Sequence, residues 1–98
     1  MGYLREKVVI ITGASTGMGR AIAVAMAAEG ASLGLVARSA DRLEQAASLA
    51  RAKGADVLTF PGDVADKEFI KRVVQAIMDG FSRIDILVNN AGTKYLSP

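Results

Sequence analysis

The chain alternates between two hydrophobic patterns along its length. Short runs of Val, Ile, Leu and Ala predict buried strands, and longer stretches with apolar residues at helical spacing predict helices. The predicted strands cover residues 7–12, 32–37, 56–60 and 84–88, and the predicted helices cover 18–29, the stretch from Ser39 to Gly54, and 66–79. Strands that alternate with helices in this way pair in parallel through right-handed crossovers.

The three predicted helices differ in how much of their surface is apolar. The first is apolar nearly all round, which predicts a buried helix, and Gly30 is its expected C-terminal cap. The second begins after Ser39, a favourable N-cap, with Asp41 in its first turn. The inner faces of the second and third helices are predicted to consist of Leu43, Ala46, Ala47 and Ala50, and of Phe69, Val73, Ala76 and Ile77.

Together these elements predict an α/β fold, a Rossmann-type doubly wound parallel sheet of four strands in the order 3-2-1-4 with three helices. A length of 98 residues suits one domain, residues 1–98. Ligands of such sheets bind above the carboxyl ends of the strands. The sheet is partial, because its fourth strand would be an open edge and the first and third helices would partly lack cover.

Composition excludes several classes of function. The chain has no cysteine and no histidine, which excludes disulfides and thiolate chemistry and leaves only carboxylates for a metal, so no metal site is predicted. Its 12 basic and 10 acidic residues give a charge of +2 and form no run, which argues against a nucleic-acid partner. No apolar stretch approaches the roughly 20 residues that span a bilayer, and no targeting peptide is visible. We therefore expect a cytoplasmic protein without a membrane partner.

A glycine-rich turn follows the first predicted strand and opens the first predicted helix. Gly13, Gly17 and Gly19 allow a sharp turn, close approach of a phosphate to the backbone, and close packing of the helix on the strand. We predict that Gly13, Ser15, Thr16, Gly17, Met18 and Gly19 hold the pyrophosphate of a dinucleotide, with hydroxyl groups of Thr12, Ser15 and Thr16 as further donors. The alternative is a purely structural glycine turn. A P-loop is excluded, because Arg20 follows Gly19 where that motif needs lysine.

The end of the second predicted strand indicates which dinucleotide is bound. A site for NAD usually places an acidic residue there to bind the ribose 2′-hydroxyl, whereas this chain has Arg38 followed by Ser39. A guanidinium at that place can bind a 2′-phosphate, and Arg42 can assist it. These residues favour NADP(H) over NAD(H) and argue against a methyltransferase. The alternative is a solvated arginine at the start of a helix.

Taken together, the motifs resemble the classical short-chain dehydrogenase/reductase family. Thr12-Gly13-x-x-x-Gly17-x-Gly19 is similar to its glycine signature, and Asn89-Asn90-Ala91-Gly92 is similar to its motif after the fourth strand. The resemblance implies that Asp63 and Val64 seat adenine, that Asn89 braces the sheet, and that Asn90, Ala91 and Gly92 line the cofactor cleft. The structural alternatives are that Asp63 caps a turn and that residues 89–92 form a loop at the end of a strand, without a role in binding.

The same resemblance implies an oxidoreductase that moves a hydride between nicotinamide and a carbonyl or alcohol carbon of a small molecule. The acid–base residues of that family, a Ser and a Tyr-x-x-x-Lys pair, lie downstream of the Asn-Asn-Ala-Gly motif and are not found here. Tyr3 and Lys7 have the spacing, but they precede the first strand. We therefore expect this chain to be the cofactor-binding half of such an enzyme, without catalytic residues and inactive alone. Assembly into a homo-oligomer is an open alternative to a monomer. The alternative is an inactive nucleotide-binding or interaction module.

Overall fold

The structure, a computed structural model, describes residues 2–90 and contains the seven elements that the hydrophobic pattern predicts, in the predicted order. Only β4 begins well inside its predicted range, because residues 83–85 form the connection from α3. The strands are β1 (Val8–Thr12), β2 (Ser32–Ala37), β3 (Val57–Pro61) and β4 (Ile86–Asn89), and the helices are α1 (Gly17–Ala28), α2 (Ala40–Arg51) and α3 (Lys67–Phe81).

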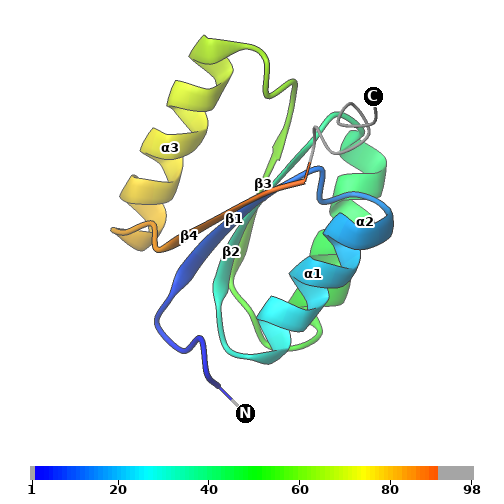
Figure 1. The fold of residues 1–98 in the computed structure, drawn as a ribbon, viewed down its shortest axis with the longest axis vertical. Coiled ribbons are helices and arrows are strands. Elements are labelled where there is room, and N and C mark those ends of the chain that lie inside the picture. The colour runs from blue at the N-terminus through cyan, green and yellow to red at the C-terminus, as the bar shows by residue number, and fades with distance from the viewer. Residues whose placement is uncertain (1, 91–98) are drawn as a thin grey trace, which may run out of the picture.

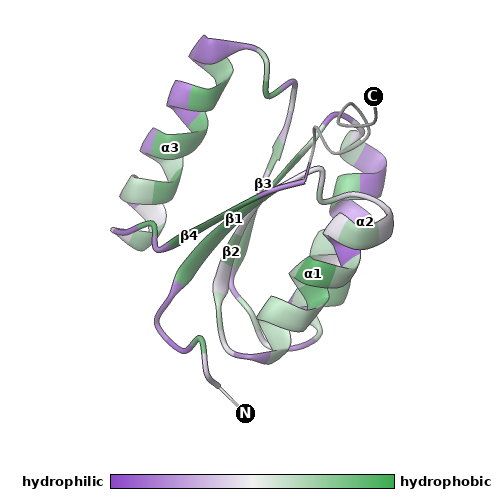
Figure 2. Ribbon diagram, viewed as in Figure 1, coloured by the Kyte–Doolittle hydropathy of each residue, from purple (hydrophilic) through white to green (hydrophobic). Residues whose placement is uncertain are grey.

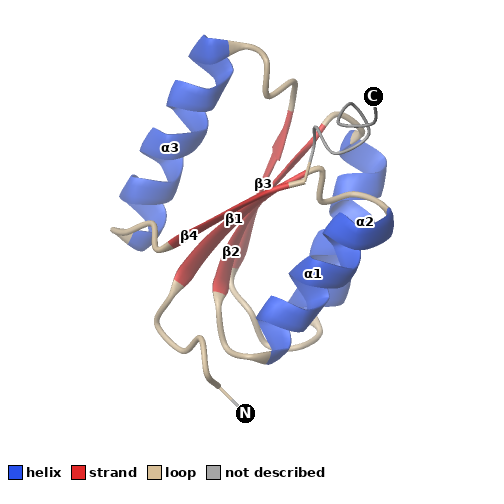
Figure 3. Ribbon diagram, viewed as in Figure 1, coloured by secondary structure: helices blue, strands red, loops and turns tan. Residues whose placement is uncertain are grey.

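All neighbouring strands are parallel, and their order is β3-β2-β1-β4. Figures 1 and 3 show three layers, with α3 on one face of the sheet and α1 and α2 on the other. Each strand is joined to the next along the chain by a helix, as parallel pairing requires. These helices cover both faces of the sheet. The predicted α/β class, doubly wound order and partial Rossmann-type sheet are confirmed.

Successive side chains of the strands point to opposite faces of the sheet and so divide the core in two. Val9 and Ile11 pack toward α1 and α2, whereas Val8 and Ile10 pack toward α3. Figure 2 shows the resulting hydrophobic strands between the helices, of which α2 and α3 carry polar segments, whereas α1 is mostly hydrophobic. Gly34 on β2 allows α3 to pack closely on the sheet, because a Cβ there would lie 2.4 Å from Cδ1 of Ile77 on α3.

The predictions for the helices differ in their outcome. Helix α2 buries the four predicted residues, and Ser39 caps it by accepting a hydrogen bond from the Arg42 N–H at 3.3 Å. The prediction that α1 is a buried helix was wrong, because it buries only Gly19, Ala23 and Ala27 among its residues. The helix contacts the sheet and α2 on one side, so its many alanines lie partly in solvent.

Strand β4 forms an edge of the described sheet, as expected. Leu87 on this strand is 63 % exposed, and Ile84 and two residues of α3, Val74 and Met78, are also exposed apolar side chains. The apolar surface expected near the fourth strand and the third helix is therefore present. Among residues 2–90, none of the helices has both the length and the apolar character needed to cross a membrane.

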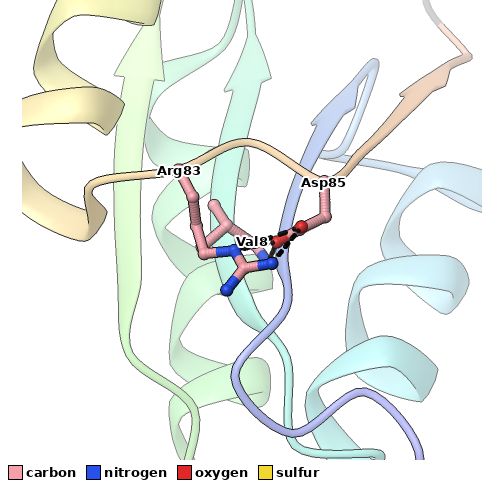
Figure 4. Close-up of polar contacts among 3 residues, drawn as sticks. All are labelled: Val8, Arg83 and Asp85. Carbon is pink, nitrogen blue, oxygen red and sulfur yellow. Dashed lines mark hydrogen bonds and ion pairs between the residues drawn. The ribbon is translucent and has the colours of Figure 1, made fainter.

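A charged connection fixes the start of β4 beside the start of β1 (Figure 4). The Asp85 carboxylate accepts hydrogen bonds from the Val8 N–H at 2.8 Å and from the Arg83 guanidinium at 2.7 Å, and the Asp85 N–H donates to the Val8 carbonyl at 2.9 Å. The hydrogen bond from Arg83, and next the one from Val8, lower the pKa of Asp85 below its ordinary value of 3.8. The ionised carboxylate is therefore the form that stabilises this junction.

Replacement of Asp85 by asparagine tests this junction through its pH dependence. Because the pKa of Asp85 is lower in the folded chain, its stabilising contribution is present above 3.8 and is lost as the pH falls through the folded pKa. The free energy of unfolding of the parent should thus exceed that of Asp85→Asn at neutral pH, and the gap should narrow only below the ordinary pKa. Urea unfolding from about pH 7 to about pH 2 measures both values.

The exposed Asp79, which bonds only the Gln75 side chain in the described part of the chain, supplies the control Asp79→Asn. A gap of the same size for Asp79→Asn, or a gap for Asp85→Asn that does not change with pH, would contradict the role given to the Asp85 carboxylate.

Candidate functional site

Every predicted site residue in the described part of the chain lies at or just beyond the carboxyl ends of the strands. The register places Thr12 of β1 beside Val36 of β2 and Asn89 of β4, and Ala37 of β2 beside Pro61 of β3. Hydrogen bonds continue past the strand ends, from the Ala14 N–H to the Val36 carbonyl at 3.2 Å and from the Gly62 N–H to the Ala37 carbonyl at 2.8 Å. The glycine turn and the ends of β2, β3 and β4 thus form one surface.

The three glycines of the turn meet two different requirements, a positive φ and close packing. Gly13 and Gly17 have φ values of 64° and 56°, which residues with a side chain rarely adopt. A Cβ on Gly19 would lie 1.9 Å from the Gly13 carbonyl oxygen, so only glycine lets α1 approach β1 this closely. A Cβ on Gly17 would meet no atom of residues 2–90 within 4 Å, so this backbone faces open space in the described structure. The turn is therefore tight on its inner side and accessible on its outer side.

Helix α1 differs from the other two helices at its N-terminus. The first turns of α2 and α3 hold Asp41 and Glu68, and Ser39 and Asp66 cap them by accepting hydrogen bonds from backbone N–H groups. Helix α1 has neither an acidic residue in its first turn nor a side-chain cap from Thr16. Its first N–H groups and the positive end of its dipole are thus left to an external anion. This arrangement suits the predicted pyrophosphate site.

Thr12 has a different role from the one predicted for it. Its hydroxyl group is buried and donates to Asn89 Oδ1 at 3.0 Å, and it accepts from the Asn90 N–H at 3.0 Å. The Asn90 side chain in turn donates through Nδ2 to the Gly13 carbonyl at 3.2 Å. The Thr12 hydroxyl therefore joins the ends of β1 and β4 and holds the turn, and is not a phosphate donor. Its place at the end of a buried strand is the sequence signal for this role.

Residues at the end of β2 and after β3 form the second part of the site. Arg38 is exposed, and its Nη2 lies 3.8 Å from Asp63 Oδ2. Asp63 Oδ1 accepts a hydrogen bond from the Ala65 N–H at 2.9 Å, which fixes the carboxylate in a turn. Val64, the next residue, is 37 % exposed. Sequence reasoning placed each of these residues but missed the ion pair between them.

Two of the predicted site residues, Ala91 and Gly92, lie outside the described residues. Asn90, which precedes them, is held against the glycine turn. Elsewhere, a hollow of about 470 Å³ lies at the amino end of β3 and includes Arg51, Asp56 and Phe81 in its lining. Among the predicted site residues that the structure describes, none lines this hollow, which lies at the opposite end of β3 from Pro61.

Comparisons with known proteins agree with the geometry. The sequence model of the family described as short chain dehydrogenase matches residues 7–98. The chain is 47 % identical over 87 residues to 11-beta-hydroxysteroid dehydrogenase-like 2 of Arabidopsis thaliana, a match that covers 88 % of this chain and 28 % of that protein.

Solved structures agree as well. L-sorbose reductase from Gluconobacter frateurii, complexed with NADPH and L-sorbose, matches with a TM-score of 0.86 and 47 % identity over 95 % of this chain and 36 % of its own. Carveol dehydrogenase from Mycobacterium avium, in complex with NAD, matches with a TM-score of 0.89 and 31 % identity. This match covers 94 % of this chain and 38 % of that protein's chain.

The chain spans between 28 % and 38 % of the length of these three proteins. Within that span, the fold, the order of the motifs and the family match all agree, and they confirm the predicted resemblance. The chain belongs to the short chain dehydrogenase family.

Proposed function

We propose that this chain binds NADP(H) as the nucleotide-binding part of an oxidoreductase. The glycine turn, with Gly13, Ser15, Thr16, Gly17, Met18 and Gly19, holds the pyrophosphate at the N-terminus of α1. Asp63 and Val64 seat the adenine, and Asn90 serves the nicotinamide end, to which the sequence motif also assigns Ala91 and Gly92. The fit of the turn to this group is supported by the open space at Gly17 and by the uncapped first turn of α1.

The preference for NADP(H) rests on the end of β2. An exposed guanidinium stands there at Arg38, and no acidic residue follows the strand before the second helix begins. Its planar donors match a phosphate, with which they form charge-assisted hydrogen bonds. The Ser39 hydroxyl oxygen accepts from the Arg42 N–H, which leaves the hydroxyl proton for the same phosphate. A ribose without the phosphate offers these groups no anion.

The comparisons support the class of cofactor more firmly than the choice within it. The L-sorbose reductase structure contains NADPH, and the carveol dehydrogenase structure contains NAD. The relative with NADPH is the more similar in sequence, at 47 % against 31 % identity. This difference points the same way as Arg38.

The proposed reaction is hydride transfer between nicotinamide and a carbonyl or alcohol carbon of a small molecule. The bound cofactor supplies the hydride donor or acceptor. The residues of this chain bind and orient it: the glycine turn fixes the pyrophosphate, and Arg38 and Ser39 fix the adenosine end. Asn90, which directly follows β4, donates to the Gly13 carbonyl and so holds the turn close to the end of β4.

Replacement of Arg38 by glutamine is expected to weaken NADPH binding by at least about tenfold, since a hydrogen bond to a charged group contributes about 1.5–3 kcal/mol. Binding of NADH, which lacks the 2′-phosphate, should change by less than about twofold. Titration of the intrinsic fluorescence of each reduced dinucleotide gives both dissociation constants.

Arg72→Gln is the matched control, because it removes the same charge from an exposed position on α3. Equal losses for NADPH and NADH in Arg38→Gln would contradict the preference for NADP(H). Failure of the parent chain to bind either dinucleotide would contradict the proposed function itself.

A further inference from the structure

The ion pair between Arg38 and Asp63 joins two parts of the proposed cofactor site before any cofactor is bound. Ala37, the last residue of β2, pairs with Pro61 of β3, and its carbonyl accepts from the Gly62 N–H at 2.8 Å. This register brings the residues that follow the two strands together, and Arg38 Nη2 lies 3.8 Å from Asp63 Oδ2. The residue proposed for the 2′-phosphate is therefore paired with the residue proposed for adenine.

The two partners differ in how firmly they are held. Asp63 Oδ1 accepts from the Ala65 N–H at 2.9 Å, and the Asp63 carbonyl accepts from the Asp66 N–H at 3.0 Å. The Arg38 side chain is 72 % exposed, and within residues 2–90 the pair with Asp63 is the one polar contact of its guanidinium. A carboxylate held by a turn thus faces an exposed guanidinium with fewer contacts, and the guanidinium is the partner that can change its contact at the smaller cost.

We propose that Asp63 competes with the 2′-phosphate of NADP(H) for Arg38 and thereby lowers the preference of the chain for NADP(H) over NAD(H). Binding of NAD(H) leaves the ion pair in place. Binding of NADP(H) transfers Arg38 from the carboxylate to the phosphate, so the pair is lost and two anions lie near each other. Asp63 is in this account a residue that sets cofactor specificity, in addition to its proposed contact with adenine.

The size of the effect follows from the exposure of the pair. Exposed ion pairs of this length are weak, and the loss of one corresponds to about a two- to fivefold change in an affinity ratio. A charge-assisted hydrogen bond to phosphate is stronger than that, so the 2′-phosphate still wins the competition. Asp63 therefore moderates the preference for NADP(H) without reversing it.

Asp63→Asn removes the charge and keeps an oxygen that accepts from the Ala65 N–H. The quantity to measure is the dissociation constant of NADH divided by that of NADPH, from fluorescence titrations at low salt, where exposed pairs are least screened. Both dinucleotides carry the same adenine, so any change in the adenine contact cancels in this ratio. We expect the ratio to rise about two- to fivefold, and to rise less at high salt.

Two further variants separate the ion pair from other causes. In an Arg38→Gln background, Asp63→Asn should raise the ratio by less than it does in the parent, because there is no guanidinium to release and only the repulsion between the carboxylate and the phosphate is removed. Glu68→Gln removes the same charge from an exposed pair with Lys71 on α3 and should not change the ratio.

The inference rests on the proposed function, and different results would contradict the one and the other. A parent chain that binds neither dinucleotide overturns both. A parent that binds both, with a ratio that stays constant or moves toward NADH in Asp63→Asn, overturns the competition alone.

Discussion

Gly19→Ala is expected to abolish tight dinucleotide binding and to destabilise the fold, the largest effect that the structure predicts for one methyl group. The new Cβ would lie 1.9 Å from the Gly13 carbonyl oxygen and 2.8 Å from Asn90 Nδ2. The closest of these atoms belongs to the backbone, so α1 must withdraw by about 1.5 Å to restore an ordinary contact of 3.4 Å. That shift removes the first N–H groups of α1 from the pyrophosphate.

The expected loss in stability is about 1–3 kcal/mol, the usual cost of overpacking, and the expected loss in NADPH affinity exceeds about tenfold. Urea unfolding and fluorescence titration measure the two quantities.

Gly80→Ala is the matched control, because Gly80 also lies in a helix, and its added Cβ would meet only the flexible end of Leu58 at 3.1 Å. Alanine is the better helix former by about 1 kcal/mol, so this variant should lose little stability and no affinity. If Gly19→Ala retained parental affinity, the turn would not be the pyrophosphate site.

Thr12→Val is expected to cost about 1–3 kcal/mol of folding free energy, although valine has nearly the same shape as threonine. The substitution removes the hydroxyl that donates to Asn89 Oδ1 and accepts from the Asn90 N–H, both at 3.0 Å. Groups that lose a buried partner incur a desolvation cost that the new methyl group does not offset. The end of β4 then loses its side-chain link to β1, while the backbone pairing of the two strands remains, and dinucleotide affinity should fall.

Two controls accompany this variant in urea unfolding and NADPH titration. Thr12→Ser keeps the hydroxyl and should retain most of the stability and affinity. Thr59→Val makes the same chemical change on β3, where the hydroxyl bonds no other residue of the described chain. A loss for Thr59→Val as large as that for Thr12→Val would contradict the special role of the Thr12 hydroxyl.

Local patterns predicted the fold well because each element carries its own signal. In α2, the Ser39 cap, the acidic first turn and the buried stripe from Leu43 to Ala50 all follow from residues within one helix. The order of the strands follows from the parallel crossovers. The exposure of α1 did not follow, because an alanine-rich helix looks the same in sequence whether one side or all sides are covered.

The site was predictable in its parts but not in its connections. Gly13, Gly17 and Gly19 are close in sequence. The predicted strand before them and the predicted helix after them indicate a phosphate-binding turn. The hydrogen bond from Thr12 to Asn89 spans 77 positions, and the one from Val8 to Asp85 also spans 77. Such pairs depend on the register of β1 with β4, which no local pattern fixes.

Binding of a dinucleotide across the glycine turn and the end of β2 should be visible directly in the positions of the backbone amide signals. In nitrogen–proton correlation spectra of the labelled chain, addition of NADPH should shift the amides of Ser15 to Gly19, of Arg38 and Ser39, and of Asp63 and Val64. NADH should shift the same signals except those of Arg38 and Ser39, which should move much less. Shifts confined to the hollow at Arg51 and Phe81, or no shifts at the glycine turn, would contradict the account.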